Sequence, residues 1–219
     1  EGAKLEQVTF DIKGGTGSLM MPSPVSRAYG VKEVALKGRI AGMLDQITLE
    51  NLRIALADGG HDGPVLTMVG KGDDLNTAPA IVLDIALSTL TLDALKHYWP
   101  EGTKPNTRSW ISNNLHGGTL TDTSFHVVLD GPRLEELDLR DLRGNSILNG
   151  IDVTYMRQMP RVEKTQSVLS ITPKEVSILL SDGIVPDAQS GKGIRVRSGS
   201  VRMTELSSDH EREIGRAHV

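Results

Sequence analysis

Residues 92–118 read LDALKHYWPEGTKPNTRSWISNNLHGG, and they decide the fold because they interrupt an otherwise uniform pattern. Apolar residues recur here at helical spacing in two groups, which are Leu92, Leu95 and Trp99 and then Trp110, Ile111 and Leu115. Nearly everything on either side alternates apolar and polar residues, as β-strands do. We therefore expect a mostly β protein with a short helical hairpin inserted near residues 91–116.

The ends of the two helices are marked in the sequence. Thr91 is placed to cap the first helix, which Pro100 then stops. Pro105 suits the first position of the second helix, and Gly117 suits the left-handed residue that closes it. We expect the aromatic residues of the hairpin to pin it onto the end of a sheet, with stacking on a ligand as the alternative. The expected structural residues are Tyr98, Trp99, Pro100, Trp110 and Gly117.

Composition excludes several classes of function. The chain has 219 residues and a net charge of −4, so it offers no broad basic surface for nucleic acid. It contains no cysteine, which excludes disulfides, thiolate metal ligands and thiol nucleophiles. No stretch approaches the ~20 apolar residues that span a bilayer. The chain starts with Glu1 rather than Met and is interpreted as an internal fragment of a longer protein.

The strands before the hairpin follow one another with clear turn signals. Residues 14–17, GGTG, predict a hairpin turn rather than a phosphate-binding loop, because no P-loop lysine follows. The apolar phase shifts near Glu50 and Asn51, which indicates a β-bulge. Residues 58–63, DGGHDG, predict a second turn, in which His61 is solvated rather than a metal ligand.

The strands after the hairpin repeat the pattern. The alternation around Phe125 places His126 on the polar side, and Asp182 with Gly183 marks a turn between two later strands. Residues 207–219 are expected to form a tail, and its last part, residues 213–219, EIGRAHV, resembles a translated sequencing adapter and is interpreted as non-native. Strands at intervals of roughly 10–20 residues without helical crossovers predict an antiparallel sheet. The scarcity of aromatic residues favours an elongated sheet over a compact sandwich.

No motif points to catalysis. The chain has no nucleophile elbow, zinc-protease, Walker or dinucleotide-binding signature, and we expect no enzyme, cofactor or metal. His97, His116 and His126 do not have the spacing of a known metal site. The basic run 192–202, KGIRVRSGSVR, is interpreted as a solvated strand face, with contact to anionic lipid head groups as the alternative.

An ordered series of residues resembles a known family. It comprises Tyr98-Trp99-Pro100, Trp110-Ile111, Leu115 to Gly118, and downstream Ile151, Val153, Tyr155, Pro160, Leu169, Ile171, Val176, Ile178, Asp182-Gly183 and residues 193–206. This series is similar to the AsmA-like proteins of the bacterial envelope, and most to the large YhdP type, across residues 78–206. Residues 1–77 fit only as a generic β-repeat segment.

The resemblance implies an elongated, twisted antiparallel sheet curled into a groove. It also implies a protein anchored in the inner membrane of a Gram-negative bacterium, spanning the periplasm and moving phospholipid between the inner and outer membranes. The expected partners are phospholipid, held without a catalytic site, and membranes, which the protein would contact through parts missing from this fragment. The residues expected to line the groove, from alternation, are Val8, Phe10, Ile12, Ile81, Leu83, Ile85, Leu87, Phe125, Val127, Leu129, Ile151, Val153 and Tyr155.

Two other readings stay open at this point. One is a structural or adhesive β-sandwich of the cell envelope whose apolar face is closed and binds no lipid. The other is a carbohydrate-active β-domain, which needs aromatic platforms and paired carboxylates; with only 3% aromatic residues, the chain gives this reading the least support.

Overall fold

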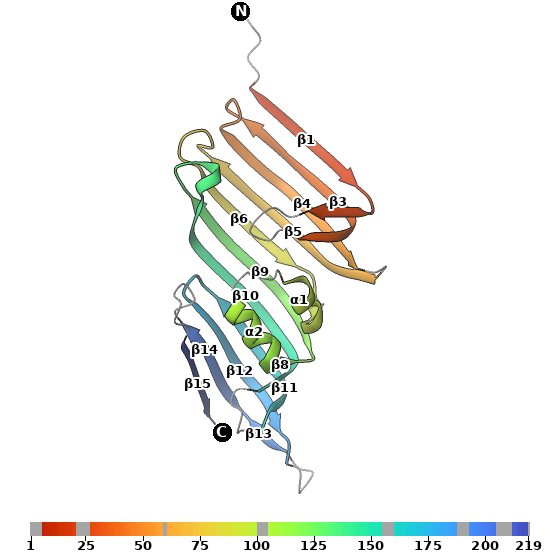
Figure 1. The fold of residues 1–219 in the computed structure, drawn as a ribbon, viewed down its shortest axis with the longest axis vertical. Coiled ribbons are helices and arrows are strands. Elements are labelled where there is room, and N and C mark those ends of the chain that lie inside the picture. The colour runs from red at the N-terminus through yellow and green to blue at the C-terminus, as the bar shows by residue number, and fades with distance from the viewer. Residues whose placement is uncertain are drawn as a thin grey trace, which may run out of the picture. The chain divides into compact units, whose positions relative to one another are not determined.

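The computed structural model describes residues 6–20, 27–58, 61–99, 105–154, 160–187, 193–204 and 212–218. Within these residues the strands form one large antiparallel sheet that does not close into a barrel, accompanied by two short α-helices (Figure 1). The strand order along the sheet is β1-β3-β4-β5-β6-β9-β10-β11-β12-β14-β15. The mostly β class with a helical hairpin, expected from the sequence, is confirmed.

The chain divides into two compact units that are interleaved in sequence. The first comprises Glu1–Met21, Ala28–Ser88 and Ser124–Arg143, and the second Pro22–Arg27, Thr89–Thr123 and Gly144–Val219. This division differs from the expected boundary at residue 77, because β9 (Thr119–Asp130) and β10 (Asp138–Val153) each contribute to both units. Sequence patterns follow the chain and do not reveal strands shared in this way.

Long antiparallel strands make up the first unit. Besides parts of β9 and β10 and the 3-10 turn η1 (Leu134–Glu136), its elements are β1 (Gln7–Gly14), β2 (Gly17–Met20), β3 (Ala28–Ala41), β4 (Gln46–Asp58), β5 (His61–Asp73) and β6 (Ala80–Leu87). The expected bulge is confirmed, because Glu50 and Asn51 of β4 together stand opposite Val69 alone. The chain reverses between β4 and β5 as expected, with Asp58 paired to His61, but residues 61–63 of the expected turn belong to strand β5.

The expected hairpin at residues 14–17 is wrong. Gly14 pairs with Val34 of β3 and Gly17 pairs with Val31, so β1 and β2 keep the same offset along one neighbour. The chain therefore continues in its original direction through the glycines instead of reversing. The glycine cluster marks a bend between β1 and β2, which follow each other along the same edge of β3. Glycine tolerates the backbone conformations of a bend as readily as those of a tight turn, so its presence does not distinguish the two.

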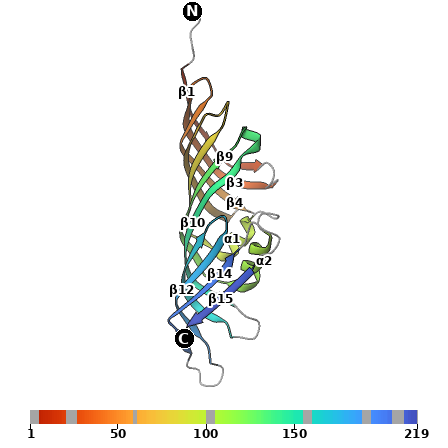
Figure 2. The same cartoon turned by 90° about the vertical axis from the view of Figure 1, so that its left-hand side faces the viewer.

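The second unit combines strands with the helical hairpin. Its elements besides parts of β9 and β10 are β7 (Leu90–Thr91), α1 (Leu92–Tyr98), α2 (Pro105–Asn114), β8 (Leu115–His116), β11 (Val162–Ile171), β12 (Glu175–Val185), β13 (Ile194–Val196), β14 (Ser198–Thr204) and β15 (Arg212–His218). β15 pairs antiparallel with β14, so part of the segment expected to be a tail extends the sheet. Both helices lie on the same side of this unit's strands (Figures 1 and 2).

The two helices begin where their capping residues predict, and Lys96 links one helix to the other. The Thr91 hydroxyl accepts a hydrogen bond from the Ala94 N–H at 3.1 Å, and α2 begins at Pro105. Lys96 of α1 donates to the carbonyl oxygens of Ser112 and Leu115, at 3.3 and 2.8 Å, at the end of α2. Its charge thus lies where the helix dipole favours a cation.

Two details of the hairpin differ from expectation. Gly117 has the expected positive φ of 63°, but α2 ends at Asn114 and the short strand β8 separates the two, so Gly117 does not close the helix. Trp99 and Trp110 are partly exposed, and Pro100 lies outside the described residues.

Buried rows of residues run across the second unit beneath the helices. Ser146, Leu169, Ile178 and Val201 are cross-strand neighbours on β10, β11, β12 and β14. Ile178 is 0% exposed and Leu148 is 1% exposed, and Leu92, Ile111 and Leu115 of the hairpin are equally buried. This side of the second unit is therefore a closed hydrophobic core.

The expected turn at Asp182 and Gly183 is wrong. Both residues lie inside β12, where Asp182 pairs with Gln166 of β11 and Gly183 pairs with Val196 of β13. A Cβ at Gly183 would stand 2.5 Å from a methyl carbon of Val162. The glycine is thus explained by close packing between strands rather than by a turn.

Candidate functional site

One face of the first unit is built almost entirely from aliphatic residues. Cross-strand pairing aligns them in four rows, for example Ile12, Leu36, Leu52, Met68 and Ile85 across five strands. Because side chains alternate between the faces of a strand, paired residues share a face. This set, called the apolar face below, consists of Val8, Phe10, Ile12, Val34, Leu36, Ile40, Ile47, Leu49, Leu52, Ile54, Leu66, Met68, Ile81, Leu83, Ile85 and Leu87.

The expected residues of β9 extend this face. The His126 imidazole lies 2.7 Å from the Asp84 carboxylate, so His126 shares the opposite, polar side of β6 and β9. Phe125, Val127 and Leu129 alternate with it and therefore lie on the side of Leu83 and Ile85. The prediction that His126 faces away from the apolar residues is confirmed.

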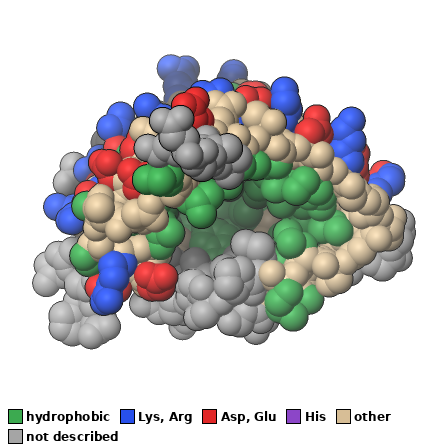
Figure 3. All heavy atoms as spheres, turned by 90° about the horizontal axis from the view of Figure 1, so that it is seen from above, with side chains coloured by type: hydrophobic (Ala, Val, Ile, Leu, Met, Phe, Trp, Pro, Cys, Tyr) green, Lys and Arg blue, Asp and Glu red, His purple; other side chains and the backbone are tan. Residues whose placement is uncertain are grey.

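The apolar face is not sealed. None of its side chains is buried, and Ile12 and Val8 are 55% and 39% exposed. The rows of the second unit show the contrast, since there the equivalent positions are nearly all below 9% exposure. Seen from above, hydrophobic side chains gather on the hollowed side of the end nearest the viewer, with charged side chains along the outer side (Figure 3).

Glycines set the contour of the apolar face. Gly38, Gly70 and Gly72 lie within its rows, and large neighbours occupy the space above them. A Cβ at Gly70 would stand 2.7 Å from a methyl carbon of Leu83, and one at Gly72 would stand 3.0 Å from Ile47. Neighbouring side chains thus occupy the space above these glycines.

The opposite face of the first unit is charged and paired. Glu50 accepts from Lys37 at 3.2 Å and from Arg39 at 3.5 Å, and Arg53 pairs with Glu33 at 3.1 Å. These pairs are at least one-third exposed, so each contributes little to stability. The charged pairs keep this face hydrated, whereas the apolar face presents only hydrocarbon side chains.

Three expected lining residues do not belong to this face. Ile151 and Val153 are 0% and 1% exposed and form part of the closed core of the second unit, so they have no surface to offer a ligand. Tyr155 lies outside the described residues. Alternation identified the correct side of β10 but could not show that it is buried.

The expected list also missed the middle of the face. Strands β3, β4 and β5 contribute nine of its side chains, none of which was among the expected lining residues. Their alternation was visible in the sequence, in Val34, Leu36 and Ile40 and again in Ile47 and Leu49. What the sequence lacked was the pairing that places these strands between β1 and β6.

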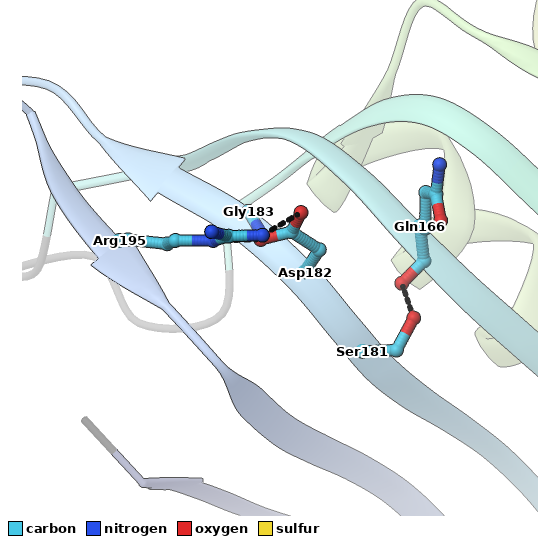
Figure 4. Close-up of polar contacts among 5 residues, drawn as sticks. All are labelled: Gln166, Ser181, Asp182, Gly183 and Arg195. Atoms are coloured by element: carbon cyan, nitrogen blue, oxygen red, sulfur yellow. Dashed lines mark hydrogen bonds and ion pairs between the residues drawn. The ribbon is translucent and has the colours of Figure 1, made fainter.

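An ion pair made by two hydrogen bonds joins two strands of the second unit. Arg195 of β13 donates from Nε and a terminal nitrogen to the two carboxylate oxygens of Asp182, both at 3.0 Å (Figure 4). The hydrogen bond from Arg195, helped by one from the Gly183 N–H, holds the pKa of Asp182 below its usual value of 3.8. Nearby, the Ser181 hydroxyl donates to the Gln166 carbonyl oxygen at 3.0 Å. The Asp182–Arg195 ion pair joins β13 to β12.

The described residues form no metal site and no membrane-spanning helix. Among the described residues there is no group of three or more His, Cys, Asp or Glu side chains that could hold a metal. No helix in the described part of the chain is long and apolar enough to cross a membrane. Comparison with protein-family models, with curated proteins and with solved structures finds no significant match.

Proposed function

We propose that the apolar face of the first unit binds phospholipid acyl chains, as part of a periplasm-spanning protein that moves phospholipid between the inner and outer membranes. One observation supports this most directly. A continuous aliphatic face crosses strands β1, β3, β4, β5 and β6, and none of its side chains is buried. An uncovered face of this size is unusual in a monomeric soluble protein and marks a binding surface.

Acyl chains fit this face better than other ligands. Its side chains supply no charged or hydrogen-bonding group, so it has no means of orienting a sugar, a nucleotide or an anion. Burial of hydrocarbon is favourable by about 0.8 kcal/mol per CH2, which lets an aliphatic face hold a chain without specific contacts. Polar head groups would remain in water beyond the edge of the face.

The proposed setting rests on the residue series that resembles the AsmA-like envelope proteins of YhdP type. In that setting the protein is inner-membrane anchored and periplasmic in a Gram-negative bacterium, contributes to outer-membrane biogenesis, and acts as a conduit rather than an enzyme. A structural or adhesive envelope module is the alternative, and it requires a second layer that closes the apolar face.

The experiment is lipid extraction combined with native mass spectrometry on the 219-residue chain purified from a bacterial envelope. We expect co-purifying phospholipid, and we expect Leu83→Asp to remove it. Val82→Asp is the matched control, because Val82 is the preceding residue of the same strand, lies on the opposite face and pairs with Lys71. Thermal unfolding of both variants separates loss of binding from loss of fold.

The outcomes discriminate between the two functions. Lipid lost in Leu83→Asp but retained in Val82→Asp, with similar melting temperatures, supports the lipid-binding face. A wild-type protein free of lipid would overturn the proposal and favour the structural module, as would equal lipid content in both variants.

A further inference from the structure

The turn between β3 and β4 presents two large aliphatic side chains to solvent. Met43 is 68% exposed and Leu44 is 60% exposed, the former tied with Met20 as the most exposed large hydrophobic residue described. They sit at the tip of a four-residue connection closed by the pairing of Ala41 with Gln46. We call Met43 and Leu44 the apolar tip.

The backbone of the apolar tip is strained. Met43 and Leu44 have φ values of 58° and 72°, directly after Gly42 at 60°. Residues with a Cβ rarely adopt this left-handed conformation, which suits glycine and asparagine. Two bulky aliphatic residues are thus held where turn chemistry favours small or polar ones, so the fold of the turn does not explain their presence.

The neighbouring loop braces the apolar tip. The Leu75 N–H donates to the Asp45 carbonyl oxygen at 3.0 Å, and the Asn76 N–H donates to the Asp45 carboxylate at 3.0 Å. The Asn76 amide also reaches the Met43 carbonyl oxygen at 3.5 Å. These bonds connect residues 42–45 to the loop between β5 and β6 and fix the direction in which the tip points.

A third loop at the same end of the first unit adds another exposed aliphatic residue. The Gly131 N–H donates to the Pro79 carbonyl oxygen at 3.2 Å, which joins the β9–β10 loop to the β5–β6 loop, and Leu134 in the former is 47% exposed. Figure 1 shows the three loops following one another along this end. Hairpin tips two strands apart are separated by about 10 Å, so the aliphatic residues form a line rather than a compact patch.

The charges of the three loops argue against binding to an anionic surface. Residues 42–45, 74–79 and 131–137 contain Asp45, Asp74, Glu135 and Glu136, while Arg133 is their one cation and pairs with Glu136. A negatively charged partner surface is therefore repelled. A line of aliphatic side chains surrounded by acidic ones is instead suited to the hydrocarbon layer of a lipid bilayer whose head groups carry no net charge.

We propose that the apolar tip inserts into the surface of a lipid bilayer with neutral head groups, and anchors this end of the first unit there. This contact is separate from acyl-chain binding on the apolar face, because the tip projects from the strand ends rather than from the face. It requires neither the function proposed above nor any residue of the apolar face.

The test is flotation of the 219-residue chain with phosphatidylcholine vesicles. We expect the wild-type chain to float, and M43N/L44G to lose roughly tenfold or more of its vesicle partitioning. Its melting temperature should not fall, because Asn and Gly accept a positive φ. L179N is the matched control, since Leu179 is 58% exposed on β12 of the second unit and should be dispensable for flotation.

A second readout does not depend on that double variant. The chain has no cysteine, so M43C and L179C can each be labelled at one position with an environment-sensitive fluorophore. Emission should shift to the blue on addition of vesicles for M43C only. Leu83→Asp should still float, which separates this proposal from the acyl-chain proposal.

Several outcomes would overturn the insertion of the apolar tip. They are failure of the wild-type chain to float, equal flotation of M43N/L44G, and flotation that appears only when phosphatidylglycerol is added. A wild-type chain that ignores vesicles but forms dimers lost in M43N/L44G would assign the tip to a protein contact instead.

Discussion

The phenyl ring of Phe10 on β1 lies over the backbone of Gly38 on β3. The two residues are cross-strand partners, and a Cβ at Gly38 would stand 2.7 Å from the ring carbon Cζ and 2.4 Å from the Thr48 carbonyl oxygen. The absence of a side chain at Gly38 therefore allows the ring to lie flat on the sheet. An aromatic residue covering a glycine in this way stabilises strand pairing near a sheet edge.

Gly38→Ala should destabilise the first unit. The added methyl group meets both the Phe10 ring and the Thr48 backbone, so we expect the free energy of unfolding to fall by about 2 kcal/mol. Urea denaturation measures this change. Gly15→Ala is the control, because nothing lies within 4 Å of a Cβ at Gly15. Equal stability of the two variants would contradict the close contact.

Thr91→Ala should weaken the start of α1. The change removes the acceptor of the Ala94 N–H, and loss of such a cap costs about 1 kcal/mol. Thr91→Ser keeps the hydroxyl and should restore most of the loss. Thermal unfolding followed by circular dichroism provides the comparison, and identical behaviour of the Ala and Ser variants would argue against the cap.

Thr123 and Ser146 should behave as a coupled pair. Their hydroxyl oxygens are 2.8 Å apart, and the residues are 4% and 2% exposed in the second unit. Ser146→Ala leaves the Thr123 hydroxyl buried without this partner, which should cost about 1–2 kcal/mol. Thr123→Val combined with Ser146→Ala should cost less than the sum of the single changes. Strict additivity in chemical denaturation would refute the coupling.

The Asp182–Arg195 pair predicts a specific pH dependence. Because the pKa of Asp182 is lowered in the folded protein, its contribution to stability is complete above about pH 3.8 and is lost as the pH falls through the lowered pKa. Arg195→Gln should return this pKa towards its usual value, as measured by carbon-detected NMR titration of the carboxyl group. Asp62, whose pKa is lowered by Lys32, should titrate unchanged in the same variant.

Alternation along the chain predicted most of the strands and the sides they present. It placed Ile81, Leu83, Ile85 and Leu87 together, and the shift of phase at Glu50 and Asn51 revealed the bulge. These successes share a cause, since both depend on local periodicity that a half-buried strand imposes on its own residues.

The failures also share a cause, because each depended on contacts between segments distant in sequence. Glycines at 14–17 and at 183 were interpreted as turns, yet pairing with β3 and packing against Val162 explain them. Ile151 and Val153 alternate as a lipid-exposed strand would, but both are buried in the core of the second unit. The sequence pattern did not identify the apolar tip, because the exposure and the positive φ of Met43 are visible only in three dimensions.

The bulge at Glu50 and Asn51 affects where insertions and deletions can be tolerated as the sequence evolves. Inserting or deleting one residue in a regular strand exchanges its two faces from that point on, which would turn lysines toward hydrocarbon and leucines toward water. At the bulge one surplus residue is already accommodated, with the pattern in phase on both sides. Natural variants of the chain should therefore gain or lose single residues at bulges and loops, and almost never within the paired stretches between them.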